Sequence, residues 1–317
     1  MSFFLTSPMI FVNKERWLSM RSPFNWVGNK YKYIDNINNI LKDKKYNKVY
    51  DVFMGSGNIL LNLNCEAKQF IGNDNIPLIP NIYKSIYITK NDFKLNELQI
   101  IINKWNRFMH KKDYYIFRDY WNEKYLNNNY DKDFIYETAI LLKMCSNSMV
   151  RFNSKKGYFN QGFRGISKGK QEFFSDTMKL QIIKGLNNLK NNLIKKDYKF
   201  TVGDFRDTLL KVTKEDIIIL DPPYILSSTM YGMNFTNEDD LCLLDYLQNT
   251  ESDYILFNYL KSENEINENL ENFLLRNPHL YVEVLSNNTS TGQNRKGGKE
   301  IIEIMVSNTK QPLNSII

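Results

Sequence analysis

The chain has 317 residues, of which 42% are hydrophobic and 24% are charged, and it carries a formal net charge of +7 with a pI near 9.0. This length and apolar content exclude a chain that is disordered overall, and they suffice for one large domain or for one domain with a substantial insertion. The positive charge favours a polyanionic partner such as a nucleic acid, although a lysine-rich composition can also reflect a biased genome.

The cysteines and the N-terminal segment exclude other classes of protein. Cys65, Cys145 and Cys242 form no paired spacing, which argues against a disulfide framework and a structural zinc, so no metal is expected. The apolar stretch 3–12 is interrupted by Pro8 and followed by charges, without a cleavage-site pattern. No segment approaches the roughly eighteen apolar residues that a membrane span needs. We therefore expect a soluble, cytoplasmic protein.

The first regular elements follow an N-terminal extension over residues 1–22. Apolar residues at helical spacing predict a helix over 31–44, and an apolar run predicts a short buried strand over 49–53. A second helix is expected over 58–64 and a second strand over 69–72. Together these segments form a β-loop-α-β unit.

The middle of the chain has a different character. Residues 92–146 are predicted to form helical segments rich in aromatic residues, which more often build a core than a platform for stacking bases. Residues 151–171 contain basic side chains and glycines but no acidic residue, so they are predicted as a basic loop and not as a packed element. A further amphipathic helix is expected over 176–194.

Strands return in the last third of the chain. One is expected over 200–203, and an isoleucine-rich strand over 216–220 must be buried on both faces. Three more strands are expected over 253–258, 280–285 and 300–306, and the last two form a predicted hairpin.

Strands and helices therefore alternate at both ends of the chain and are interrupted by a helical segment. This order predicts an α/β fold with a doubly wound, mostly parallel sheet and an inserted helical module. We expect one domain formed by residues 23–80 and 196–317, and a mainly helical domain over residues 81–195 that carries the basic loop 151–171.

The sharpest chemical signal is Asp221-Pro222-Pro223-Tyr224, directly after the isoleucine-rich strand. Such a strand delivers its carboxylate to the carboxyl edge of the sheet, where open α/β sheets bind ligands. The prolines keep the backbone extended and present carbonyl oxygens as acceptors. This set suits adenine N6, because Asp221 and the Pro222 carbonyl can each accept one amino hydrogen while Tyr224 stacks on the base. The alternative is an ordinary strand end with an Asp-Pro turn.

A glycine-containing loop, Asp51 to Gly57, follows the first strand and opens a helix. Glycines there allow a ligand to approach the backbone closely. Asp74 ends the next strand, at about the distance where an acidic residue meets a ribose in dinucleotide folds. The loop lacks a complete G-x-G-x-x-G, so it argues against a nicotinamide or flavin. A structural role for the glycines is the alternative, but together with Asp74 the loop favours a nucleoside ligand such as S-adenosylmethionine.

The chain resembles the Dam-like, D12-type (class α) family of DNA adenine N6-methyltransferases over roughly residues 23 to 306. Residues 23–30 resemble its N-terminal motif, residues 51–57 its donor loop and residues 221–224 its D-P-P-Y motif. The resemblance implies a Rossmann-like methyltransferase fold and an enzyme that transfers the methyl group of S-adenosylmethionine to N6 of a flipped-out adenine, leaving S-adenosylhomocysteine. It assigns catalysis to Asp221, Pro222, Pro223 and Tyr224. It assigns donor binding to Trp26, Lys30, Phe53, Gly55, Gly57, Asp74, Asp204, Phe205 and Asp221.

The same resemblance implies double-stranded DNA as the partner and residues 81–195 as the target-recognition domain. Residues 146–153 resemble the family's DNA-reading segment, in which Arg151 would read a guanine edge and Met149 would wedge against the base stack. A phosphate contact is the alternative for Arg151. The residues expected to bind DNA are Asn147, Met149, Arg151, Asn153, Lys155, Phe163, Arg164, Arg295 and Lys296.

Two departures and two alternatives limit this resemblance. Where the family commonly has F-N-x-P-F-G, Gly162 replaces the proline and Arg164 replaces the last glycine, so a GATC target is not carried over. One alternative is methylation of an RNA base or a protein glutamine, whose sites more typically have Asn in place of Asp221. The other is a non-catalytic DNA-binding protein. We expect a monomer, with dimerisation on DNA as an option, and a cognate restriction endonuclease that acts separately.

Overall fold

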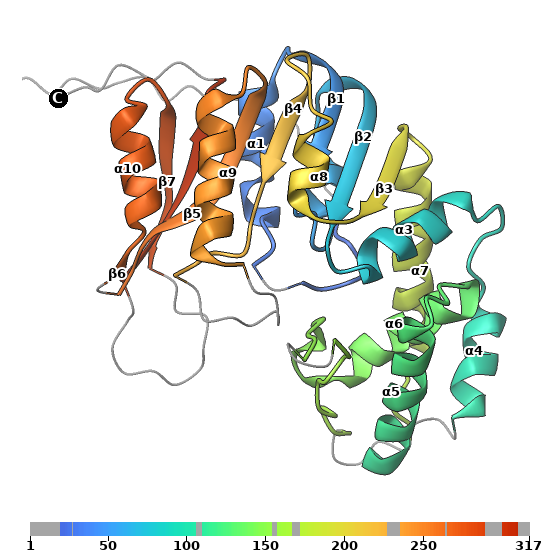
Figure 1. Cartoon of the computed structure of the whole chain (residues 1–317). Coiled ribbons are helices and arrows are strands. Elements are labelled where there is room, and N and C mark those ends of the chain that lie inside the picture. Colours follow the sequence, from blue (N-terminus) through green and yellow to red (C-terminus); the bar gives the residue numbers. More distant parts are fainter. Residues whose placement is uncertain are drawn as a thin grey trace, which may run out of the picture.

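The structure is a computed structural model that describes residues 20–26, 28–105, 110–153, 157–166, 172–226, 235–263, 265–288 and 300–309. A sheet flanked by helices carries a helical part on one side (Figure 1). The strands are β1 (Lys45–Asp51), β2 (Glu66–Asp74), β3 (Tyr198–Val202), β4 (Ile217–Leu220), β5 (Asp253–Ser262), β6 (Glu265–Ile266), β7 (Tyr281–Asn288) and β8 (Glu300–Ser307). The helices are η1 (Tyr31–Tyr33), α1 (Ile34–Leu41), α2 (Asn58–Asn62), α3 (Leu78–Ile88), α4 (Leu95–Lys104), α5 (Lys111–Leu126), α6 (Lys132–Met144), η3 (Ser146–Ser148), α7 (Asp176–Leu193), α8 (Phe205–Leu209), α9 (Asn237–Asn249) and α10 (Glu268–Arg276).

The strand order of the sheet is β3-β2-β1-β4-β5-β8-β7, and β6 pairs with β5 off this path. Strands β1 to β5 pair in parallel, whereas β8 is antiparallel to both β5 and β7. The chain moves outward from β1 to β3 and returns to β4 on the other side of β1. The order therefore reverses between β1 and β4, and ligands of open α/β sheets bind beyond the carboxyl ends of the strands at such a switch point. The doubly wound, mostly parallel sheet and the terminal hairpin predicted from the sequence are both confirmed.

Helices cover both faces of the sheet because its central strands bury side chains in both directions. Residues Ile217 and Ile219 of β4 join the apolar cluster that contains α1, α3 and α7, whereas Ile218 and Leu220 join the cluster that contains α8, α9 and α10. All four side chains are fully buried, as the sequence predicted for this strand. Helices α9 and α10 were missed by the sequence analysis, although α9 begins with a capping box.

An aromatic core holds helices α4, α5 and α6 together. The fully buried Trp121 ring stacks on Tyr125 and Phe134, with ring centroids 5.4 and 5.0 Å apart. Its indole N–H donates to the Thr138 hydroxyl at 2.9 Å, so the polar atom of this ring is satisfied inside the core. The prediction that the aromatic residues of 92–146 form a core is confirmed for these rings, while Phe108 lies outside the described residues.

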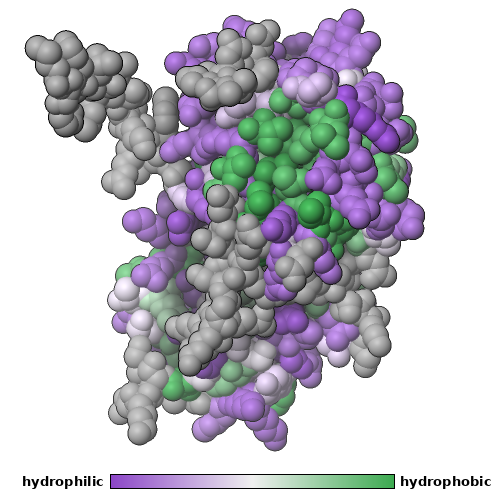
Figure 2. All heavy atoms as spheres, turned by 90° about the vertical axis from the view of Figure 1, so that its left-hand side faces the viewer, coloured by the Kyte–Doolittle hydropathy of each residue, from purple (hydrophilic) through white to green (hydrophobic). Residues whose placement is uncertain are grey.

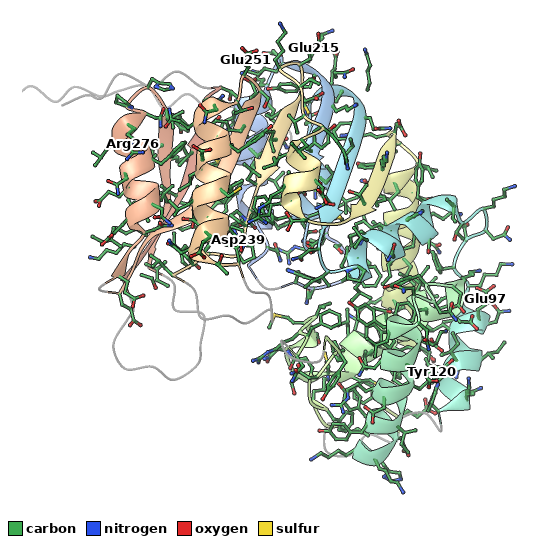
Figure 3. The ribbon with its side chains drawn as sticks, viewed as in Figure 1. Glu97, Tyr120, Glu215, Asp239, Glu251 and Arg276 are labelled. Carbon is green, nitrogen blue, oxygen red and sulfur yellow. The ribbon has the colours of Figure 1, made fainter. Side chains whose placement is uncertain are left out.

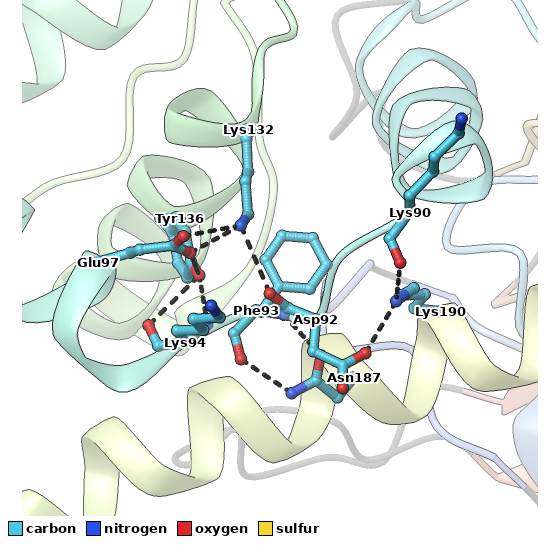
Figure 4. Close-up of polar contacts among 9 residues, drawn as sticks. All are labelled: Lys90, Asp92, Phe93, Lys94, Glu97, Lys132, Tyr136, Asn187 and Lys190. Atoms are coloured by element: carbon cyan, nitrogen blue, oxygen red, sulfur yellow. Dashed lines mark hydrogen bonds and ion pairs between the residues drawn. The ribbon is translucent and has the colours of Figure 1, made fainter.

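The segment between α3 and α4 is tied to α7 by a polar network (Figure 4). The Asn187 side chain accepts from the Phe93 amide at 2.8 Å and donates to the Phe93 carbonyl at 3.0 Å. One turn later, Lys190 Nζ donates to the Lys90 carbonyl at 3.0 Å and lies 2.8 Å from the Asp92 carboxylate. Helix α7 thus holds the chain where it passes from the sheet into the helical part. The domain division expected at residues 80/81 falls within α3, which packs on β2 and β3.

Residues 151–153 and 157–166 differ from the unpacked basic loop that the sequence predicted. Phe152 and Phe159 form an isolated β-bridge, and both rings are buried. The Asn122 side chain accepts from the Phe159 amide at 2.8 Å and donates to its carbonyl at 3.0 Å. The prediction was wrong here because the aromatic residues of the segment point into the helical core while Arg151 stays exposed.

Strand β7 forms one edge of the sheet, and Figure 2 shows the molecule from the side on which this strand lies. Apolar side chains gather in a patch on this face. In this region α10 and β7 expose Leu275, Val282 and Val284. The described residues contain no helix that is long and apolar enough to span a membrane.

Candidate active site

Strand β4 carries Asp221 to the switch point of the sheet. Its register with β1 places Ile219 opposite Asp51, so both strands end at the same edge and their aspartates lie close together. In Figure 1 these carboxyl ends point toward the side of the molecule where the helical part lies. The catalytic segment predicted from the sequence therefore lies at the edge where the fold binds ligands.

Asp221 is held by a lysine and a tyrosine that are far apart in sequence. Lys30 Nζ lies 2.8 Å from Asp221 Oδ1, and the Tyr224 hydroxyl donates to the same oxygen at 2.8 Å. Among the described residues no hydrogen bond or ion pair reaches Oδ2, which leaves this oxygen as an acceptor. Burial raises the pKa of Asp221, and the ammonium group of Lys30 opposes this rise. The arrangement thus combines a fixed carboxylate with one unused oxygen.

Glu303 of β8 is a member of this cluster that the sequence analysis missed. Its Oε1 lies 3.5 Å from Lys30 Nζ and 3.4 Å from the Tyr224 hydroxyl, and its Oε2 accepts from the Tyr33 hydroxyl at 2.9 Å. The signal that could have found it is a glutamate inside the otherwise apolar run Ile301 to Val306. A carboxylate in such a run must have partners, because burying an unpaired charge costs on the order of several kcal/mol.

Tyr224 lies against the same cluster through its ring. The ring centroid is 4.3 Å from that of Tyr259, and Lys30 Nζ lies 5.0 Å from it. Burial and the neighbouring carboxylates of Asp221 and Glu303 raise the pKa of the Tyr224 phenol well above its usual value. The hydroxyl therefore remains protonated and acts as a donor to Asp221.

Asp51 is a buried carboxylate without a hydrogen-bond partner among the described residues. Its side chain is 1% exposed, and both of its oxygens are unsatisfied. Burial, followed by the charges of Asp221 and Asp74, raises its pKa well above the usual value. An unpaired carboxylate at a ligand-binding edge fits a cationic ligand group, because only a partner of opposite charge would offset its burial.

The loop after β1 brings backbone and ring atoms together. Gly55 has a φ of +48°, and a Cβ added there would lie 3.1 Å from the Trp26 ring, so the glycine allows this close approach. The Gly55 amide donates to Asp74 Oδ2 at 2.8 Å, and the Ile76 amide donates to Asp74 Oδ1 at 2.9 Å. Burial raises the pKa of Asp74 to about 6. Gly57 has a φ of +71° and packs against the Tyr83 ring, where an added Cβ would lie 2.7 Å from a ring carbon.

A pocket opens beside the switch point. Three predicted donor residues, Phe53, Asp204 and Phe205, line it, and Pro223 of the catalytic segment lies at its wall. The Phe53 and Phe205 ring centroids are 5.4 Å apart, which provides an aromatic wall for a planar ligand. The lining residues that the sequence analysis missed are Val52, Asn73, Asn75, Gly203, Phe235 and Asp239.

Two of the lining residues, Asp204 before α8 and Asp239 of α9, belong to an ion cluster. Arg206 lies 3.1 Å from Asp204 and also contacts the Asp239 carboxylate. Figure 3 labels Asp239 at the edge of the sheet that faces the helical part, whereas Glu215 and Glu251 lie at the opposite edge. Asp74 is not among the pocket-lining residues, because its oxygens are turned toward the Gly55 and Ile76 amides.

The predicted DNA-reading segment lies at the end of α6. Asn147 has a φ of +62°, and the Val150 amide donates to the Asn25 carbonyl at 3.1 Å, which joins this segment to the N-terminal motif. Asn147, Arg151 and Arg164 are exposed, whereas Met149 and Asn153 are half-buried. Phe163 packs against Tyr114 and Phe173, so its ring has core neighbours. Lys155, Arg295 and Lys296 lie outside the described residues.

The fold and this site define an α/β protein of the methyltransferase type, in which an Asp-Pro-Pro-Tyr segment stands at the switch point beside an aromatic pocket. The chain belongs to the D12 class N6 adenine-specific DNA methyltransferase family, which it matches over residues 26–296. This membership confirms the family resemblance drawn from the sequence motifs.

Individual relatives agree with the family. The chain is 27% identical over 297 residues to "Modification methylase StsI" of Streptococcus sanguinis, covering 89% of this chain and 42% of that protein. It is 22% identical over 246 residues to "Type II methyltransferase M.FokI" of Planomicrobium okeanokoites, covering 75% of this chain and 35% of that protein. The chain thus spans less than half the length of these curated relatives.

Among solved structures, the rRNA methyltransferase aviRa from Streptomyces viridochromogenes is similar with a TM-score of 0.35 and 11% identity, covering 88% of this chain and 84% of that one. This likeness is too weak to carry weight for fold or function. In the described part of the chain, no group of three or more His, Cys, Asp or Glu residues is arranged to hold a metal ion.

Proposed function

We propose that this protein transfers a methyl group from S-adenosylmethionine to N6 of adenine in double-stranded DNA. The observation that carries the proposal is Asp221 at the switch point, with Lys30 and Tyr224 both on Oδ1 and Oδ2 left as an acceptor. Membership of the adenine-specific DNA methyltransferase family supports it. The names of the relatives, which are modification methylases, support a role beside a separate restriction endonuclease.

The residues at the carboxyl edge fit a donor with a cationic and an aromatic end. Asp51, which is buried and has no hydrogen-bond partner among the residues described, would face the cationic end, and Gly55 with Trp26 would border the methionine part. Phe53, Phe205 and Asp204 would hold the nucleoside in the pocket. When bound, S-adenosylmethionine supplies an electrophilic methyl group on a positively charged sulfur. Asp74 would act near the ribose of the donor in one of two ways. It would either hold the loop through the Gly55 and Ile76 amides, or release these amides and accept hydrogen bonds from the ribose hydroxyls.

The catalytic residues act mainly by alignment. Asp221 Oδ2 and the Pro222 carbonyl would each accept one amino hydrogen of adenine, which draws the N6 lone pair out of the ring plane. Lys30 and Tyr224 keep the carboxylate in one orientation, and the Tyr224 ring or its neighbour Tyr259 would contact the base. The reaction needs no covalent enzyme intermediate, so positioning of the amino group contributes most of the rate.

We assign target recognition to residues 81–195. A base inside a duplex must be extruded before its amino group can reach Asp221, at a cost of a few kcal/mol, roughly that of unstacking and unpairing. The exposed side chains Asn147, Arg151 and Arg164, with Met149 beside them, would supply contacts that offset this cost. The protein would act on DNA as a monomer.

Replacing Asp221 with Ala tests the proposal. Sequencing that detects N6-methyladenine should find methylated sites in DNA from cells expressing the wild-type protein and none with Asp221→Ala, because the acceptor for the amino hydrogen is lost. Asp245→Ala, at an exposed position on α9, is the matched control and should methylate like the wild type. Donor binding by Asp221→Ala should be largely retained in a calorimetric titration. Undiminished methylation by this variant would overturn the assignment.

A further inference from the structure

Glu303 stands at an irregular position of the sheet. Strand β8 pairs Glu303 with Tyr259 of β5, and the register shifts directly afterwards, between Tyr259 and Lys261. On the other side of β8 the register with β7 also shifts, between Val284 and Ser286, where Ser286 is opposite Glu303. Bulges next to active sites commonly serve to redirect a side chain. Both neighbouring strands are thus adapted to the same residue.

The burial of Glu303 requires the partners that it has. The residue is 6% exposed, and its neighbours in β8 on both sides are apolar. Lys30 Nζ lies 3.5 Å from it, the Tyr33 hydroxyl donates to it at 2.9 Å, and the Tyr224 hydroxyl lies 3.4 Å away. A glutamate so placed costs free energy of desolvation, and a hydrophobic residue would suit the strand better if the fold alone were at stake.

We propose that Glu303 is a positioning residue for methyl transfer: it holds the Lys30 ammonium so that this group, together with the Tyr224 hydroxyl, engages one oxygen of Asp221 and leaves the other for the substrate amino group. The proposal rests on the proposed function of the Asp221 site. Glu303 does not touch the reacting atoms, because Lys30 and Tyr224 stand between it and Asp221. Its effect is exerted through them.

The contacts of Lys30 explain how Glu303, its third partner, fixes the orientation of the ammonium group. Its ammonium group donates to the Gly28 carbonyl at 2.7 Å and lies 2.8 Å from Asp221 and 3.5 Å from Glu303. These three acceptors match the three N–H bonds of an ammonium group. When the charge of this third acceptor is removed, the ammonium group is attracted less strongly to position 303 and can turn to share both oxygens of Asp221.

Glu303 also changes the charge balance at Asp221. The titratable groups near Asp221 are Lys30, Tyr224, Glu303, Asp51 and Tyr259, from five different segments, and those near Glu303 are Lys30, Tyr33, Tyr224, Tyr259 and Asp221. The negative charge of Glu303 raises the pKa of Asp221. Removing that charge therefore lowers the pKa of Asp221, so that Asp221 ionises at lower pH. If Glu303 only filled space in the core, its replacement could lower the rate of methyl transfer without changing the pKa of Asp221. A change in both quantities therefore separates a positioning role from a packing role.

Glu303→Gln tests the proposal, since it keeps the size of the side chain and removes the charge. In steady-state methylation assays we expect kcat to fall about 10- to 100-fold, as for a misaligned reacting group, with KM for DNA and the donor dissociation constant within about twofold of wild type. The acid limb of the kcat profile, set by ionised Asp221, should move to lower pH because the negative charge that raises the pKa of Asp221 is removed. Glu303→Asp should recover part of kcat because the charge is restored.

Glu283→Gln is the matched control, because Glu283 is a half-buried glutamate on the adjacent strand whose partners are Asn36 and Tyr281. It should leave kcat and the profile unchanged. Carboxyl-carbon NMR of aspartate-labelled protein, with the Asp221 signal assigned by Asp221→Asn, should give a lower Asp221 midpoint in Glu303→Gln whether or not methyl transfer occurs. An unmoved midpoint or an unchanged kcat overturns the role of Glu303. If the wild-type protein does not methylate DNA, the proposed function is overturned. The midpoint of the Asp221 titration then still decides whether Glu303 acts on Asp221.

Discussion

Burial of Asp51 is unfavourable, and no contact among the described residues of the folded protein offsets it. Its carboxylate lies at the end of β1 with no hydrogen-bond partner among the described residues and with Asp74 and Asp221 nearby. Residues that break a local rule of this kind are expected at functional sites, where a ligand completes the missing contact. We therefore expect the Asp51 side chain to link the stability of the fold to the binding of a cationic ligand group.

We expect Asp51→Asn to stabilise the free protein and to weaken donor binding. Near neutral pH the free energy of unfolding should rise by about 1–3 kcal/mol, because Asn keeps the size of the side chain but removes the charge whose burial is unfavourable. The folded-state pKa of Asp51 is raised, so the wild type loses stability as the pH rises from the unfolded pKa toward the folded one, and the advantage of Asn grows over the same range. Below pH 4 the two proteins should be nearly equal.

Urea unfolding at several pH values, paired with calorimetric titration of S-adenosylmethionine, checks both signs. Asp245→Asn on the exposed face of α9 is the control and should change neither quantity. If Asp51→Asn destabilises the free protein at pH 7, the carboxylate must have a stabilising partner and its assignment to a cationic ligand group fails.

The passage from α3 to α4 shows how an element gains its position from a few polar contacts. The chain there has no regular structure, and the Asn187 side chain of α7 satisfies both backbone groups of Phe93. Tyr136 of α6 donates to the Glu97 carboxylate of α4 at 2.5 Å, which continues the network to the other helices in Figure 4. Helix α7 thus sets the place of the helical part relative to the sheet.

Asn187→Ala should lower the free energy of unfolding by about 1–3 kcal/mol, because two backbone groups of a half-buried segment lose their partner. Hydrogen exchange followed by mass spectrometry should show faster exchange over residues 89–94 than in the wild type. Asn188→Ala is the control, since Asn188 is the exposed neighbour on the same helix. Equal exchange in both variants would mean that the aromatic core alone holds this segment.

In the whole molecule, the carboxyl ends of the parallel strands lie at the edge of the sheet that faces the helical part, and their amino ends lie at the opposite edge (Figure 1). The exposed cation Arg151 lies in the segment joined to the N-terminal motif through Val150 and Asn25. Lys45, by contrast, begins β1 and lies at the opposite end of the strand from Asp51, paired with Glu66 on the surface. The fold therefore places cations of similar exposure in different relation to the proposed DNA-binding side.

We expect this difference to appear in the salt dependence of DNA binding. Fluorescence anisotropy with a labelled duplex should give a plot of log Kd against log salt whose slope falls by about 1 in Arg151→Gln, as for the loss of one phosphate contact. Lys45→Gln should leave the slope unchanged. If the two variants behave alike, net charge and not the position of Arg151 determines binding. If Arg151→Gln alters sequence preference and leaves the slope unchanged, Arg151 reads a base.

The sequence by itself determined the elements whose signal is local. The apolar run Ile217 to Leu220, the following Asp221 to Tyr224 and the glycine loop before α2 are each contiguous, so their structure and their place at strand ends could be predicted. The aromatic core of α5 and α6 followed from composition for the same reason. These features depend on the order of residues within one segment and on its apolar pattern, and both can be read from the segment itself.

Only the tertiary structure decided which distant residues share a site. Glu303 meets Lys30, which is 273 residues earlier in the chain, because β8 inserts between β5 and β7 with register shifts against both strands. The burial of Phe152 and Phe159 in a basic segment likewise depends on what packs against them from elsewhere, and so does the lack of a hydrogen-bond partner for Asp51 within the described part of the chain. A buried charge is recognised as functional only when its surroundings are known, since its free energy depends on the partners that the fold brings to it.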